Sequence, residues 1–332
     1  MVQTASKPYI YVGGEKGGLV RKQEGDTSWE ALTNGLPADL VVVQVAVNPS
    51  RPELVLLGSR KGAYISYDRG DSWSAVALPE SGLEIWSFAF HPTQPDTIYV
   101  GTAPAQIYRS RDAGVTWDTL PIVIDPAAVC DLGFPTRIIA MVVNPANPTE
   151  MYAGMEVGGM IRSLDGGDSW ESINNGMIGD EDKVDIHGVA MSSLEPETPY
   201  MITRLGPWRG HDRGSRWEFI DLKPFSPITH TRDFKLDPHA PGTLYAGVGA
   251  SVYGEDGALL RSSDMGKTWE RADKGVKPNS TVRCVSLSSS SPSTIYCCTR
   301  YGQVFGSGDG GDTWQEYQLP EGVTELRAVA VS

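Results

Sequence analysis

The stretch Ser66-Tyr-Asp68-Arg-Gly70-Asp-Ser72-Trp73 decides the fold of this chain, because its pattern S-x-D-x-G-x-[ST]-W returns four more times. The further copies end at Trp117, Trp170, Trp269 and Trp314, and two degenerate copies end at Trp29 and Trp217. The seven tryptophans are therefore separated by 44, 44, 53, 47, 52 and 45 residues. A period in the forties is typical of an array built blade by blade. The repeat predicts one closed object of seven similar units.

Each unit has room for four short strands bounded by turn residues. In the fourth unit these strands are expected at 138–144, 150–154, 159–163 and 169–173. Branched and aromatic residues favour strands, and Gly, Pro, Asn and Asp favour the turns between them. Seven units of four strands predict an all-β fold, a seven-bladed β-propeller that forms a single domain over residues 1–332.

The two ends of the chain are expected to share one blade. The chain enters its first strand at Tyr9-Ile-Tyr-Val12, which matches the second strand of the other units. The missing first strand is found at residues 326–331, which read Leu-Arg-Ala-Val-Ala-Val. We expect this last strand to complete the first blade and to close the ring, which removes exposed strand edges.

The repeated string resembles the Asp-box, also called the BNR repeat, over essentially the whole chain. Asp-boxes occur in sialidases, xyloglucan-active glycoside hydrolases, sortilin-type receptors and a photosystem II assembly factor. The resemblance implies a propeller but leaves the activity open, since one fold carries many functions. Turn chemistry explains the box itself: Asp and Ser bond nearby backbone N–H groups, Gly tolerates positive φ, and Trp anchors the outer strand.

Composition narrows the classes of partner. The formal charge of -13 argues against nucleic acids and anionic membranes. No stretch approaches the roughly 18 apolar residues of a membrane span. The start, Met1 to Pro8, lacks a charged-then-apolar signal sequence, so a cytoplasmic location is expected. The sequence points to no cofactor and to no metal.

Candidate functional residues converge at one mouth of the central channel. In a propeller, the innermost strand of each blade starts at this mouth and the next strand ends there. Aligning the seven units places Trp86, His187, Arg232, Arg283 and Arg327 in one innermost column. Asp185 and His230 lie two residues earlier, and Arg60, Glu156, Arg204 and Arg300 occupy the end of the second strand. An acidic protein thus concentrates Arg at one place.

The types of these residues suggest how a ligand would be held. Arg matches a carboxylate or phosphate with a rigid fork, so the six arginines are predicted to bind an anion together with His230. Trp86 could stack on a sugar or aromatic ligand or simply fill space, and His187, Asp185 and Glu156 are the candidate acid–base residues. In the structural alternative, the arginines are neutralised by carboxylates and plug the channel. The candidate carboxylates are Glu15, Glu84, Glu156, Asp185 and Glu325.

Two functions follow from this pattern. The first is a glycosidase-like hydrolase or a lyase that acts on a small anionic, carboxylate-bearing molecule, for which a sugar acid is one candidate. The second is a non-catalytic assembly scaffold whose arginines bind an acidic protein segment. Sialidases carry an F/Y-R-I-P motif, whereas the nearest string here is Phe134-Pro-Thr-Arg-Ile138. No catalytic residue of a known family can therefore be carried over.

Overall fold

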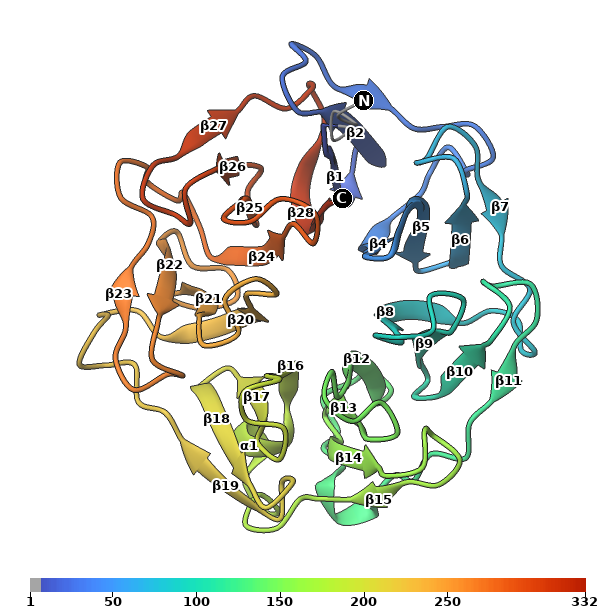
Figure 1. The fold of residues 1–332 in the computed structure, drawn as a ribbon, viewed down its shortest axis with the longest axis vertical. Helices are drawn as coiled ribbons and strands as arrows, with labels where there is room; N and C mark the ends of the chain where they lie inside the picture. Colours follow the sequence, from blue (N-terminus) through green and yellow to red (C-terminus); the bar gives the residue numbers. More distant parts are fainter. Residues whose placement is uncertain (1–6) are drawn as a thin grey trace, which may run out of the picture.

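Seven antiparallel sheets of four strands surround a central channel (Figure 1). The computed structural model describes residues 7–332, so the expectation drawn from the first residues lies mostly outside the described part. The prediction of a seven-bladed all-β propeller is confirmed. No helix in the described residues is long and apolar enough to cross a membrane.

The blades follow one another around the ring, with the innermost strand given first for each. Blade 1 comprises β28 (Thr324–Val331), β1 (Tyr9–Lys16), β2 (Leu19–Gln23) and β3 (Glu30–Ala31). Blade 2 comprises β4 (Val42–Asn48), β5 (Arg51–Ser59), β6 (Gly62–Ser66) and β7 (Ser74–Ala75). Blade 3 comprises β8 (Glu84–Phe90), β9 (Ile98–Ala103), β10 (Ile107–Ser110) and β11 (Asp118–Thr119). Blade 4 comprises β12 (Arg137–Val143), β13 (Met151–Glu156), β14 (Gly159–Ser163) and β15 (Glu171–Ser172).

The remaining three blades repeat the order. Blade 5 comprises β16 (Ile186–Met191), β17 (Pro199–Thr203), β18 (Gly206–His211) and β19 (Arg216–Phe219). Blade 6 comprises β20 (His230–Leu236), β21 (Leu244–Gly249), β22 (Gly257–Ser262) and β23 (Glu270–Arg271). Blade 7 comprises β24 (Val282–Leu287), β25 (Ile295–Thr299), β26 (Val304–Ser307) and β27 (Gln315–Tyr317). A 3-10 turn (Pro126–Ala128) and the short helix α1 (Glu181–Val184) lie in connections between blades.

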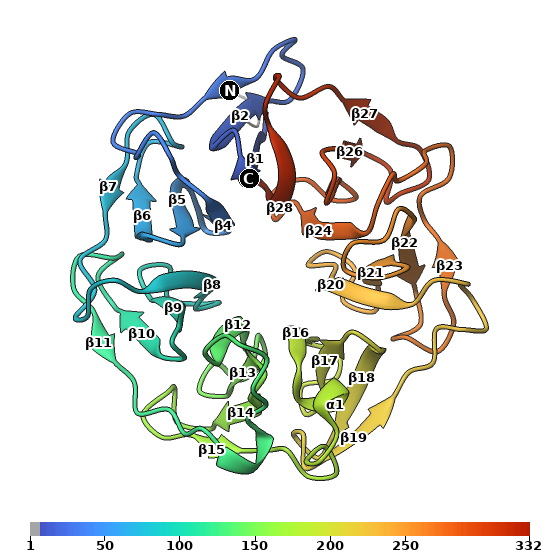
Figure 2. The ribbon, with the colours of Figure 1, turned by 180° about the vertical axis from the view of Figure 1, so that it is seen from behind.

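The last strand closes the ring as predicted. β28 pairs antiparallel with β1, with Ile10 opposite Val331 and Val12 opposite Val329. The backbone N–H of Tyr9 donates to Oγ of Ser332 over 2.8 Å. Figure 2, which shows the ring from behind, places β28 beside β1 in this blade. Blade 1 therefore joins the two ends of the chain by main-chain hydrogen bonds.

The Asp-boxes are turn structures, as the sequence indicated. In the box of blade 4, the backbone N–H of Ser169 donates to Oδ1 of Asp165 over 2.8 Å, and that of Gly167 donates to Oγ of Ser163 over 2.8 Å. Trp170 donates its indole N–H to the Gly167 carbonyl over 3.1 Å. Gly167 has a φ of 96°, a conformation that glycine adopts without strain. The box carboxylates are therefore occupied within their own turns.

The boxes also tie neighbouring blades together through arginines of the third strands. Arg109 donates to the Gly166 carbonyl of the next blade over 2.8 Å, and Arg261 donates to the Gly310 carbonyl over 2.8 Å. Arg162 reaches the carbonyl of Arg213 over 2.7 Å in the same way. Each accepting residue directly follows the box aspartate, so the turn presents one carbonyl to the preceding blade. These contacts join blades 3 and 4, blades 4 and 5, and blades 6 and 7.

Candidate functional site

All eleven predicted site residues line one cavity of about 550 Å³ at the mouth of the channel. Trp86, His187, Arg232, Arg283 and Arg327 come from five innermost strands, namely β8, β16, β20, β24 and β28. Glu156 ends β13, and Arg60, Arg204 and Arg300 directly follow β5, β17 and β25. The propeller topology therefore brings together residues that are spread over most of the chain.

The five innermost residues form the floor of this cavity. Trp86, His187, Arg232, Arg283 and Arg327 also line a smaller cavity of about 140 Å³. That cavity is lined in addition by residues further along the same strands, among them Phe88, Val189 and Lys235. The floor layer thus separates an open mouth, where a ligand can enter, from a small space inside the channel.

Some arginines of the site are neutralised and others are not. Arg327 donates Nε–H to Oε1 of Glu15 over 2.9 Å, and Arg204 pairs with Asp182. Arg232, Arg283, Arg60 and Arg300 have no carboxylate within 4 Å among residues 7–332. Burial, reinforced by the charge of Arg232, lowers the pKa of Arg283 well below its ordinary value. The mouth therefore holds uncompensated positive charge.

Three of the five expected carboxylate partners were assigned wrongly. Glu84 accepts the indole N–H of Trp86 over 3.0 Å, Glu325 pairs with Lys16 over 2.7 Å, and Oδ2 of Asp185 lies 3.3 Å from Nε2 of His187. None of the three forms an ion pair with an arginine within residues 7–332, because each lies nearer to another polar side chain. With open volume and four unpaired arginines, the structure does not show the fully neutralised plug.

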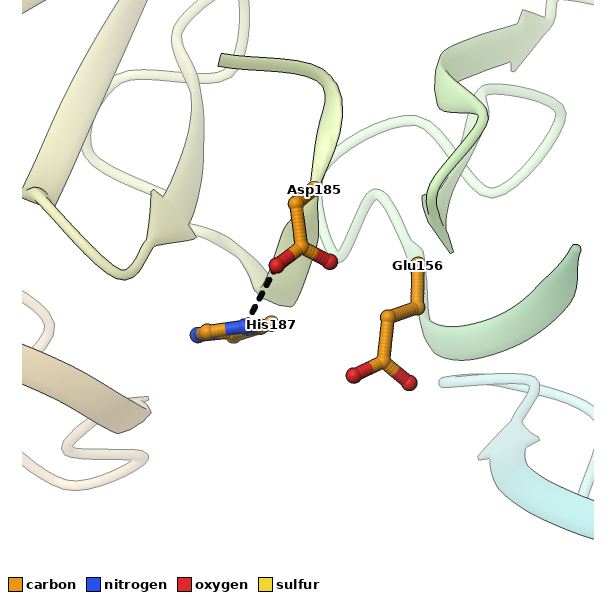
Figure 3. Close-up of side chains that lie close together, drawn as sticks. All are labelled: Glu156, Asp185 and His187. Atoms are coloured by element: carbon orange, nitrogen blue, oxygen red, sulfur yellow. Dashed lines mark hydrogen bonds and ion pairs between the residues drawn. The ribbon is translucent and has the colours of Figure 1, made fainter. Parts of the chain in front are cut away.

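Glu156, Asp185 and His187 form a compact group on one wall (Figure 3). One ligand atom from each lies within 4.8 Å of the others. Glu156 forms an ion pair with Arg137, and Oδ2 of Asp185 lies 3.3 Å from Nε2 of His187. Burial alone would raise the pKa of Asp185, but the contact with His187 and the charge of Arg232 lower it overall. Asp185 is therefore ionised at neutral pH.

Both nitrogens of His187 face acceptors. Nδ1 lies 3.1 Å from the carbonyl oxygen of Thr231, and Nε2 lies 3.3 Å from Oδ2 of Asp185. Nη1 of Arg232 lies 2.9 Å from Nε2 and 3.4 Å from Nδ1, so the guanidinium lies over the face of the ring. Burial and the charge of Arg232 lower the pKa of His187, which keeps the ring neutral. A neutral ring has one N–H, so it can donate to Thr231 or to Asp185 but not to both.

Three polar atoms of the site have no hydrogen-bond partner within the described chain. They are Oδ1 of Asp185, Nε2 of His230 and Nε of Arg232, all buried from solvent. Burial and the charge of Arg232 lower the pKa of His230 to about 4, so this ring is neutral at pH 7. Buried polar atoms without partners are uncommon in proteins, and here they gather around one cavity.

The carboxylate–histidine group suits an anion site better than a metal site. Glu156, Asp185 and His187 offer a ligand set that a divalent cation could use. However, Arg137 is paired with Glu156, and the charged guanidinium of Arg232 lies 2.9 Å from Nε2 of His187. A cation placed here would also meet the charges of Arg232 and Arg283. The residues present do not fit a resident metal ion.

Sequence reasoning did not assign Arg137, Phe134 and Tyr253 to the site. The guanidinium carbon of Arg137 lies 3.9 Å from the ring centroid of Trp86 and 4.0 Å from that of Phe134. Arg137 covers one face of Trp86, so a ligand cannot stack on that face. Arg300 lies over the ring of Tyr253 at 4.3 Å. Arg137 was visible in the aligned columns, whereas the two aromatic residues lie in irregular connections with no periodic signal.

Comparison with known proteins supports the fold and narrows the class. Residues 61–152 match the family model described as Sortilin-Vps10: Sortilin, neurotensin receptor 3. Xyloglucanase Xgh74A of Acetivibrio thermocellus is 26% identical over 312 residues, covering 80% of this chain and 36% of its own length. A xyloglucanase of Paenibacillus sp. is 25% identical and covers 80% of this chain and 30% of its own length. The chain therefore spans about a third of the length of the curated relatives it matches.

Solved structures show the same ring at low sequence identity. The GH74 xyloglucanase from Xanthomonas campestris superposes with a TM-score of 0.71 at 19% identity, covering 98% of this chain and 52% of its own. The structure titled YCF48 bound to D1 peptide gives a TM-score of 0.57 at 16% identity and covers 88% of this chain and 93% of its own. These likenesses concern the fold alone.

Repeats, box geometry and comparisons together define the class of this molecule. It is an Asp-box (BNR) repeat β-propeller of seven blades. Within that superfamily it is similar to glycosidase propellers of the xyloglucanase type, and no single family is selected.

Proposed function

We propose that this protein binds a small, carboxylate-bearing, sugar-like molecule in the cavity and acts on it as a glycosidase-like hydrolase or a lyase. The observation that carries the proposal is the group of unpaired arginines beside an ionised carboxylate and a neutral histidine. Uncompensated arginines in a partly buried cavity favour an anion. The similarity to xyloglucanases supports a carbohydrate as the remainder of the ligand.

Binding and acid–base chemistry would be coupled through Arg232. In the free protein, the Arg232 guanidinium lies against the ring of His187, and its charge helps to lower the pKa of that ring. A ligand carboxylate that binds this guanidinium would offset its charge and make His187 a stronger base. His187 would then accept a proton, either from water attacking a glycosidic bond or from the carbon next to the ligand carboxylate. The protonated ring would donate one N–H to Asp185, which already lies 3.3 Å away, and the other to the Thr231 carbonyl.

Calorimetry with D-glucuronate and D-galacturonate tests the anion site. Arg283→Ala should weaken binding by about tenfold or more, because a charge-assisted hydrogen bond contributes about 1.5–3 kcal/mol. It should also make the remaining binding less sensitive to salt. Arg111→Ala removes the same charge from an exposed residue and is the matched control. Equal affinities of the two variants, or no binding by the unmodified protein, would contradict the proposal.

The role of His187 is tested by separating binding from turnover. His187→Ala should retain binding of the two sugar acids but abolish cleavage of their glycosides, because the proton acceptor is removed. Cleavage is followed by the release of reducing ends, and an unsaturated product detected by ultraviolet absorbance would identify a lyase. Undiminished turnover in His187→Ala would exclude His187 as the base.

The second candidate function is a non-catalytic scaffold that binds an acidic protein segment. One observation favours it. This chain covers 93% of the peptide-bound YCF48 structure but only 52% of the xyloglucanase structure from Xanthomonas campestris. Tight binding of acidic peptides with no binding of sugar acids would support the scaffold in place of the enzyme.

A further inference from the structure

We call the cavity of about 550 Å³ at the mouth of the channel the anion cavity. A second hollow of about 720 Å³ adjoins it on the side of blades 5 and 6. Its apolar lining includes Leu205, Trp208, Phe219 and Ile228. Arg204 and His230 line both hollows, so the two spaces meet at these side chains. We call this second hollow the blade 5 groove.

The aromatic wall of the blade 5 groove is held in place. The rings of Trp208 and Phe219 lie 4.9 Å apart at 55°, a tilted packing. The indole N–H of Trp208 donates to Oγ1 of Thr203 over 3.2 Å. A Cβ on Gly206 would lie 3.1 Å from the ring of Phe219, so the glycine leaves room for that ring. Phe219 is 39% exposed, which leaves part of its surface free for contact.

Charge distinguishes the blade 5 groove from the anion cavity. Arg204, at the boundary, is paired with Asp182. Lys223 is the one charged side chain of the lining with no ion pair among the described residues, and it is exposed. The other cavity instead gathers four unpaired arginines, Arg60, Arg232, Arg283 and Arg300. An acidic group is therefore favoured in the anion cavity, and a unit with an uncharged, apolar face is favoured in the groove.

We infer that the two hollows are adjoining subsites for one ligand: an acidic sugar joined to a neutral sugar unit. The acidic unit occupies the anion cavity, and the pyranose ring of the neutral unit lies against Phe219 and Leu205. The bond between the units then passes Arg204 and His230, where Nε2 of His230 is free to donate or accept. This inference rests on the proposed anion binding and extends it to the size of the ligand.

The probes are D-glucuronate, glucuronosyl-xylose, D-galacturonate and galacturonosyl-rhamnose, each titrated by calorimetry. At least one disaccharide should bind about 3- to 10-fold more tightly than its free acid, the gain expected from contact with an aromatic surface. Phe219→Ala and Leu205→Ala should remove most of this gain and leave the affinity for the free acid unchanged. Melting temperatures confirm that the variants fold.

Leu194→Ala is the matched control for Leu205→Ala. Leu194 is an exposed leucine, 62% accessible, in the connection between β16 and β17, at the other end of the same blade. Its replacement should leave the gain intact. Equal affinities for acids and disaccharides in the unmodified protein would overturn the inference while leaving the anion site standing. An unchanged gain in both groove variants would overturn it as well. Failure of all four probes to bind would instead reject the anion site, and the inference with it.

Discussion

The surroundings of individual carboxylates distinguish the structural ones from the candidate functional ones. Asp165 is enclosed in its own turn by Ser163, by Ser169 and by backbone N–H groups. Asp185 instead keeps one buried oxygen without a partner and faces His187. A carboxylate whose acceptor sites are filled by local donors has nothing to offer a ligand. This difference supports a structural role for the boxes and leaves the wall of the cavity as the place for chemistry.

Asp165→Ala should lower the free energy of unfolding by about 1 kcal/mol through lost turn hydrogen bonds, and leave ligand affinity unchanged. These bonds lower the pKa of Asp165 to about 2, below its ordinary value of 3.8. The carboxylate therefore stabilises the fold fully above pH 4, and the contribution disappears as the pH falls toward 2. Urea unfolding of both proteins from pH 7 to pH 2 should show their difference closing over that lower range. A difference independent of pH would contradict this account.

At the scale of elements, the cavity is lined by residues of the regular strands and by residues of irregular connections between them. The segment 121–136 reaches the mouth through Phe134, whose ring packs on Arg137 opposite Trp86. Arg137 in turn pairs with Glu156. One aromatic residue of a loop thereby orients a candidate catalytic carboxylate, and this chain of contacts links blades 3 and 4.

Phe134→Ala should loosen segment 121–136 and weaken ligand binding severalfold, because a cation–π contact contributes roughly 0.5–1 kcal/mol at an exposed site. Hydrogen exchange over this segment should become faster while the blades keep their protection. Val129→Ala is the control, since Val129 belongs to the same segment, is 44% exposed and lies outside the lining of the cavity. Equal exchange rates in both variants would show that the stack does not hold the segment.

At the scale of the whole molecule, closure by β28 makes the site possible. Arg327 comes from this last strand, and its partner Glu15 comes from the first. The anion cavity therefore contains residues from both ends of the chain. The arginine contacts between third strands and neighbouring boxes join blades 3 and 4, blades 4 and 5, and blades 6 and 7.

Truncation before Leu326 should abolish cooperative folding, since it opens the ring and exposes the edge of β1. Thermal unfolding followed by circular dichroism would show a broad transition or none. As a control, residues 326–332 moved in front of Tyr9 through a short linker should restore part of the transition, because β28 then pairs with β1 as a hairpin. An unchanged melting temperature in the truncated chain would contradict the role of closure.

The sequence by itself determined the seven blades, the closing strand, the turn role of the boxes and the set of side chains around the mouth. Each of these follows from periodicity and strand alternation. Both are visible within a single unit of the sequence, and every blade repeats them. The roles of His187, Asp185, Glu156 and the arginines stay predictions, as does the cytoplasmic location. Only the tertiary structure decided which arginines are neutralised, as the wrong assignments of Glu84, Asp185 and Glu325 show. It also decided the contact of Arg232 with His187, the stacking of Arg137 and the blade 5 groove, because these depend on contacts between blades and loops that carry no repeat.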